Sequence, residues 1–76
     1  MDADNFRNTM TELTEIRPFR IFTIELLNGR RIEIDHPKAV NFRDGTGVFL
    51  LPGGTPIIFD HQSLNSIVVA PASQQV

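Results

Sequence analysis

The chain has 76 residues, a net charge of −2, two histidines and no cysteine. A chain of this length forms one domain, residues 1–76, and buries only about 60% of its unfolded surface. Because disulfides and thiolate zinc sites are excluded, the remaining common means of stabilising so small a domain is association with further copies of itself.

The sequence contains no apolar run of about 18 residues, and its first residues are acidic and polar. We therefore expect no membrane span, no signal peptide and a cytoplasmic protein of bacterial type. Residues 1–16 carry four acids and one arginine (−3), and residues 17–76 carry six basic groups and five acids (+1). This balance lacks the strongly basic surface that phosphate-dominated binding favours.

Residues 4–16 are predicted to form a helix. Apolar residues at spacings of four, three and three give it one buried stripe: Phe6, Met10, Leu13 and Ile16. Asp2 or Asp4 is a suitable N-cap, and Pro18 ends the element because the residue before a proline avoids helical backbone.

Residues 19–27 and 30–35 are predicted to form a β-hairpin around Asn28-Gly29, since apolar residues alternate on both segments. A two-residue turn would set Ile24 opposite Glu33, whereas a three-residue loop sets Ile24 opposite Ile32 and Glu25 opposite Arg31. Burial selects the second register. It places Gly29 in the left-handed conformation of a G1 bulge.

Residues 36–47 are predicted to form a connection in which Val40 and Phe42 point inward from a short strand or turn. Residues 44–47, Asp-Gly-Thr-Gly, have the composition of a turn. Residues 48–51 and 57–59 form a second hairpin, residues 61–64 a 3₁₀ turn capped by Asp60, and residues 66–70 the last strand. Residues 71–76 form a disordered tail.

The resulting fold class is mostly β, with an N-terminal helix and a five-stranded, strongly bent antiparallel barrel over residues 19–70. This order of elements is that of SH3-like and Sm-like small barrels. The later strands are apolar on both faces, so either both faces are covered within one copy or a second copy covers one of them. The small size of the chain favours the second alternative. The predicted oligomer interface consists of Ile57, Ile58, Phe59, Ile67, Val68 and Val69.

Two Asp-His pairs, Asp35-His36 and Asp60-His61, carry the side chains best suited to bind a metal. Turn capping explains them better, so we expect no metal and no other cofactor. Ser63 lies near His61, but no serine has the context of a nucleophile elbow. The Gly53-Gly54 loop lacks the lysine and the helix of a phosphate-binding loop. We therefore expect no enzyme activity.

Two segments resemble Sm-like proteins. The segment I-E-L-L-N-G-R-R-I-E-I is similar to the first Sm motif, and I-I-F-D-H-Q-S-L-N-S-I-V-V-A-P is similar to the end of Hfq, the bacterial Sm-like RNA chaperone. Phe59 and His61 match the aromatic residue and the histidine, whereas Asp60 stands where that family has a basic residue. The R-P-F, N-G and H-P steps resemble most closely a set of small bacterial proteins without an assigned activity.

The resemblance implies a ring in which the fourth strand of one copy pairs with the fifth strand of the next. We expect a non-enzymatic, oligomeric binding or scaffold module with a protein or peptide ligand at a barrel edge. The alternative that the resemblance implies is binding of single-stranded RNA by Phe59, His61 and Arg43 near a central pore.

Overall fold

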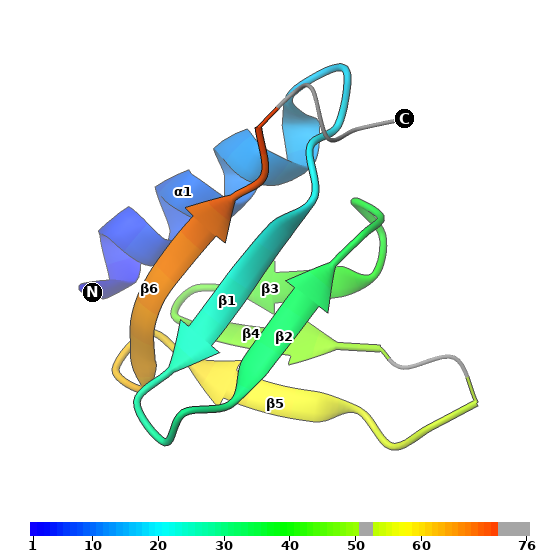
Figure 1. Ribbon diagram of the computed structural model, residues 1–76. Helices are drawn as coiled ribbons and strands as arrows, with labels where there is room; N and C mark the ends of the chain where they lie inside the picture. Colours follow the sequence, from blue (N-terminus) through cyan, green and yellow to red (C-terminus); the bar gives the residue numbers. More distant parts are fainter. Residues whose placement is uncertain (51–52, 72–76) are drawn as a thin grey trace.

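The computed structural model describes residues 1–50 and 53–71, which form one helix and six strands (Figure 1). The elements in chain order are α1 (Ala3–Glu15), β1 (Phe22–Leu26), β2 (Arg31–Ile34), β3 (Val40–Arg43), β4 (Thr46–Phe49), β5 (Ile57–Asp60) and β6 (Leu64–Val69). The end of the predicted strand at residue 51 and the predicted tail beyond Pro71 lie outside the described residues.

The mostly β composition with an N-terminal helix is confirmed, but the described strands do not form a single five-stranded barrel. They form two antiparallel sheets, sheet A with the order β2-β1-β6 and sheet B with the order β3-β4-β5. The break lies at residues 35–39. Pro37 has no N–H to donate, and the Ala39 N–H donates to the His36 carbonyl at 3.0 Å, so the chain turns away from sheet A.

Helix α1 begins at the predicted cap. The Asp2 carboxylate accepts a hydrogen bond from the Asn5 N–H at 2.7 Å, which satisfies one of the free donors of the first turn. Phe6 and Met10 are fully buried. Ile16 does not continue the stripe: its backbone is extended ahead of Arg17-Pro18, and its side chain is exposed.

The β1–β2 hairpin has the predicted register. Ile24 lies opposite Ile32, Phe22 opposite Ile34 and Glu25 opposite Arg31. Gly29 has a φ of +88°, and its N–H donates to the Leu26 carbonyl at 2.9 Å. The bulged three-residue loop is therefore confirmed. It is the loop that places the alternating apolar side chains of both strands on one buried face.

The β3–β4 hairpin confirms the short strand expected at Val40 and Phe42 and corrects the extent of the turn that follows it. Residues 40–43 form a full strand, and the turn consists of Asp44 and Gly45 alone, because Arg43 pairs directly with Thr46. Gly47 is therefore a strand residue. A Cβ atom at Gly47 would lie 2.5 Å from Cζ of Phe59, so the glycine makes room for this ring rather than for a turn.

The second predicted hairpin is confirmed as β4–β5, with Val48 opposite Ile58. Asp60 caps the following turn as predicted, although the turn does not extend into a 3₁₀ helix. Strand β6 begins two residues earlier than predicted, because buried Leu64 pairs with Leu26 across an irregularity in the β1–β6 ladder.

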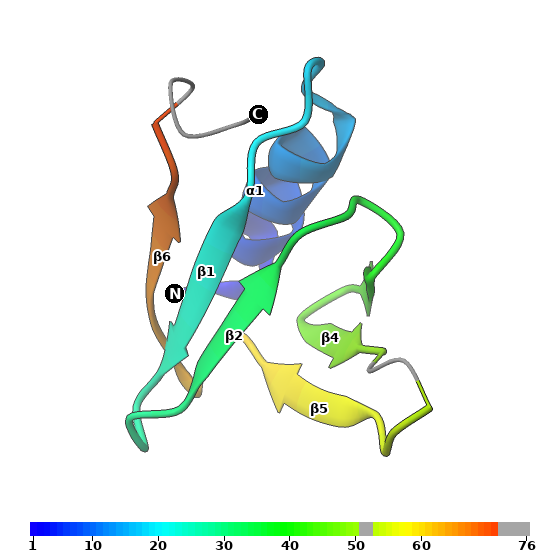
Figure 2. The ribbon, with the colours of Figure 1, turned by 45° about the vertical axis from the view of Figure 1, so that its right-hand side comes forward.

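The core lies between the two sheets and the helix. Figures 1 and 2 show α1 and sheet B on the same face of sheet A. The buried residues come from all three parts of the fold: Phe6, Met10, Phe22, Ile24, Leu26, Ile32, Ile34, Val40, Phe49, Phe59 and Leu64.

Candidate interaction surface

The six residues predicted to form an oligomer interface fall into two groups. Phe59 is only 3% exposed, and Ile57 and Ile67 are half-buried against the core. Ile58, Val68 and Val69 are exposed by 71%, 55% and 37%. On β5 one face therefore lies in the core and the other at the surface. On β6, Val68 and Val69 point to opposite faces, and both are exposed near the end of the strand.

Strands β5 and β6 are edge strands of their sheets. In an antiparallel ladder, alternate residues direct their backbone groups to the neighbouring strand. The Ala70 N–H donates to the Ile21 carbonyl and the His61 N–H to the Gly45 carbonyl. This alternation directs the backbone groups of Ile58 on β5, and of Ile67 and Val69 on β6, toward the outer edges.

Phe59 lies where it cannot stack on a base. Its ring packs edge-on against Phe6, with 6.1 Å between the ring centroids and 76° between the ring planes, and it also lies over Gly47. Exposing this ring would open the core. Of the three residues predicted to bind RNA, Phe59 is therefore not accessible at the surface.

His61 and Arg43 lie beside the same turn. His61 is half-buried over Gly45, and its Nδ1–H donates to the Met1 carbonyl at 2.7 Å. Arg43 is exposed at the end of β3, next to the turn at residues 44–45. The structure therefore brings His61 and Arg43 to one end of sheet B and leaves Phe59 beneath it.

The outer face of sheet A carries a polar network across all three strands. Nε of Arg31 lies 2.7 Å from Oε2 of Glu25, and the Ser66 hydroxyl donates to Oε1 of Glu25 at 2.6 Å. The Ser66 hydrogen bond, followed by the charge of Arg31, lowers the pKa of Glu25. The sequence predicted the contact between Glu25 and Arg31 but not the one with Ser66, since it did not fix the register of β6.

The Asp60 turn is occupied by hydrogen bonds within the turn. Its carboxylate accepts from the N–H groups of Gln62 and Ser63 at 3.0 and 2.9 Å, and the Ser63 N–H is the main cause that lowers the pKa of Asp60. The Ser63 hydroxyl bonds to the Asp60 backbone. Among residues 1–50 and 53–71, no three His, Cys, Asp or Glu side chains gather as a metal site.

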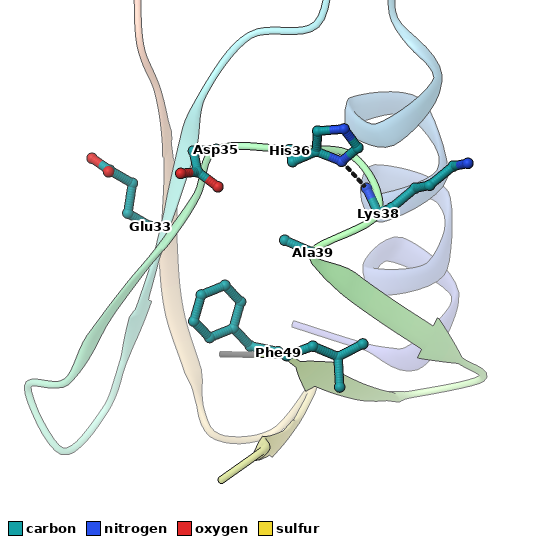
Figure 3. A pocket seen from close by; sticks show the side chains of 7 residues that line it. Glu33, Asp35, His36, Lys38, Ala39 and Phe49 are labelled. Carbon is teal, nitrogen blue, oxygen red and sulfur yellow. Dashed lines mark hydrogen bonds between the residues drawn. The ribbon is translucent and has the colours of Figure 1, made fainter. Parts of the chain in front are cut away.

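Two surface pockets lie at the ends of β2, and sequence reasoning did not find them. One, of about 350 Å³, has Glu33 and Asp35 on one side, His36 and Lys38 on the other, and Phe49 at its base (Figure 3). The other, of about 450 Å³, is lined by Arg30 together with residues 55–58. The one feature of the sequence that could have indicated these pockets is Pro37, which lies at the break between the two sheets.

Comparisons of the chain with protein-family models, with curated proteins and with solved structures each find no match. In the described part of the chain, no helix has the length and apolar character needed to cross a membrane.

Proposed function

We propose that this protein is a non-enzymatic binding or scaffold module that associates with further copies of itself through β5 and β6. One observation carries the proposal: Ile58 on β5 and Val68 on β6 expose large apolar side chains on edge strands. An edge strand with unpaired backbone groups is a template for another strand.

The position of these edges supports the proposal further. In Sm-like rings the fourth strand of one copy pairs with the fifth strand of the next. The two strands that flank the Asp60 turn, β5 and β6, have the corresponding place at the end of this chain. An Sm-like relationship and a ring-shaped assembly are therefore part of the proposal.

The exposed side chains are large enough to matter energetically. Fully burying a Val or Ile side chain contributes about 1.5–3 kcal/mol. Each copy offers both edges, so one copy can contact two neighbours. This head-to-tail arrangement closes into a ring when the rotation between copies permits it.

The test is the mass of the protein in solution, measured by multi-angle light scattering. We expect an oligomer for the parent and a folded monomer for Ile58→Arg. Leu27→Arg is the matched control, because Leu27 is also strongly exposed, at 66%, but lies in the β1–β2 loop. A folded monomer for the parent, or equal loss of association in both variants, would remove the proposal.

A second candidate is binding of single-stranded RNA, which the shared location of His61 and Arg43 beside the turn at residues 44–45 favours. We expect Arg43→Ala to weaken binding of labelled U-rich or A-rich RNA and to reduce the salt dependence of binding. Arg7→Ala, on the helix, is the charge-matched control. Absence of an anisotropy change with either RNA at low salt would exclude this candidate.

A further inference from the structure

At the free edge of β2, only alternate residues direct their backbone N–H and C=O groups outward. Its hairpin partner β1 bonds to alternate residues, beginning with the Leu26 N–H and the Arg30 carbonyl at 2.8 Å. The backbone groups of Ile32 and Ile34 therefore face β1, and those of Arg31 and Glu33 face outward. No described strand pairs with this edge, which is the end of the order β2-β1-β6.

Apolar residues of sheet B and of the segment that follows β4 line the space beside this edge of β2. The pocket at one end of β2 has Phe49 and Leu50 among its lining residues, and the pocket at the other end has Ile57. Leu50 is 44% exposed. Figure 2 shows that sheet B crosses below β2 and extends beyond it. A strand added to β2 would consequently have an apolar surface under its inward side chains.

The outer face of β2 carries a positive side chain followed by a negative one. Arg31 and Glu33 lie two residues apart on the same face, and both are exposed. Arg31 contacts Glu25 through Nε while 73% of its side chain remains exposed, and a guanidinium has five N–H donors. A second carboxylate therefore has donors available at Arg31.

We propose that the β2 edge binds an extended peptide by adding it as an antiparallel strand, a site that deepens the binding function proposed above without requiring self-association. Residues directly opposite one another share a face, and opposite charges in such pairs are favourable. The peptide has a basic residue opposite Glu33 and, two positions later, an acidic residue opposite Arg31. The positions opposite Ile32 and Ile34 are apolar and face sheet B. The pattern from the N-terminus is apolar, basic, apolar, acidic.

A peptide fits this edge better than a second copy of the chain. Neighbouring strands lie about 4.8 Å apart, so one added strand occupies the space directly above the protruding part of sheet B. A second copy would bring its own sheet B to that place. The occupant is therefore a single extended segment of the stated charge order.

The test uses two fluorescein-labelled peptides of equal composition, Thr-Val-Lys-Ile-Glu-Thr and the charge-reversed Thr-Val-Glu-Ile-Lys-Thr. Fluorescence anisotropy should show about tenfold tighter binding of the first peptide to the parent, since two cross-strand pairs change from favourable to unfavourable. The double variant Arg31→Glu with Glu33→Lys keeps the net charge and should prefer the second peptide. Equal binding of both peptides to the parent, or binding of neither, would overturn the proposal.

Two further measurements keep the result interpretable. Glu33→Lys alone leaves the ion pair between Glu25 and Arg31 in place, and it should lose the preference even if the double variant fails to fold. Amide hydrogen exchange of Arg31 and Glu33 should slow when the first peptide is bound, and unchanged exchange would contradict strand addition. Light scattering on the same samples separates the proposals: peptide binding by a parent protein that is a monomer sustains this one alone, and an oligomer without peptide binding removes it alone.

Discussion

Sheets A and B have the same number of strands but cover their outer faces differently. Sheet A presents Arg31, Glu25 and Ser66, which satisfy one another across its three strands, and an exposed apolar side chain, Val68, on the same face of its edge strand β6. Sheet B presents Ile58, which is 71% exposed, beside half-buried Val48. The polar, internally paired part of sheet A is complete in one copy, whereas exposed Val68 and Ile58 gain by contact with a partner.

The two sheets also differ in how they fill the core. Sheet A contributes the ring of Phe22 and otherwise aliphatic side chains, among them Ile24 and Ile34. Sheet B combines a glycine, Gly47, with a large ring, Phe59, directly opposite it on the next strand. The packing of sheet B therefore requires both the ring of Phe59 and the lack of a side chain at Gly47.

The largest effect is expected at neighbouring positions of β5. Phe59→Ala should lower the free energy of unfolding by about 3–5 kcal/mol, because it removes a buried ring from the core. Ile58→Ala should change it by less than about 0.5 kcal/mol when measured in a Val68→Arg background, which we expect to be monomeric because a charge replaces the exposed valine of β6. Urea denaturation of both variants checks this contrast. A reversal of the two effects would mean that the faces of β5 are assigned the wrong way round.

Gly47→Ala should destabilise the fold by about 1–3 kcal/mol, since the added methyl group would overlap with the ring of Phe59. Combining it with Phe59→Leu tests whether this overlap is the cause. The double variant should be more stable than the sum of the two single effects predicts. Strict additivity, measured by thermal and urea denaturation, would show that Gly47 is needed for another reason.

Gly29→Val should cost about 1–2 kcal/mol, because a β-branched residue resists the positive φ of +88° at this position. No atom lies within 4 Å of the added Cβ, so the cost comes from the backbone alone. Gly29→Asn is the control, as asparagine tolerates this conformation. Thermal denaturation checks the pair, and an unchanged melting temperature for the valine variant would contradict the bulged loop.

The smallest effect concerns the polar face of sheet A. The pKa of Glu25 is lowered below its ordinary value of 4.5, so its contribution to stability is present above that value and is lost as the pH falls through the folded-state pKa. Ser66→Ala removes the largest cause and should raise the pKa of Glu25. NMR titration of the Glu25 carboxyl group measures this change directly. The stability difference between variant and parent should shrink on acidification, and a difference that is constant with pH would exclude this origin.

The contrast between the sheets also explains how much the sequence could predict. The first hairpin was predicted down to its register, because alternating polar and apolar residues allow only one pairing that buries the apolar face. In sheet B, Gly45 and Gly47 have the same composition signal, yet Gly45 lies in a turn beside the His61 ring and Gly47 lies within a strand under the buried ring of Phe59. Local composition cannot distinguish them, since the ring of Phe59 comes from a distant part of the chain.

The candidate surfaces show the same limit. The sequence identified apolar strands near residues 57–59 and 67–69 but could not state which side chains faced outward. The structure separates Ile58 and Val68 from buried Phe59. The pockets beside β2 depend on the break between the sheets at residues 35–39, which the prediction of a continuous barrel did not include.

The most direct test of self-association through β5 and β6 is amide hydrogen exchange of the parent protein under native conditions. Ile58, Ile67 and Val69 direct their N–H groups to the outer edges, so a single copy does not protect them. Pairing of these edges between copies predicts slow exchange at all three amides in the parent and fast exchange in Ile58→Arg. Fast exchange at all three in the parent would contradict the proposed association.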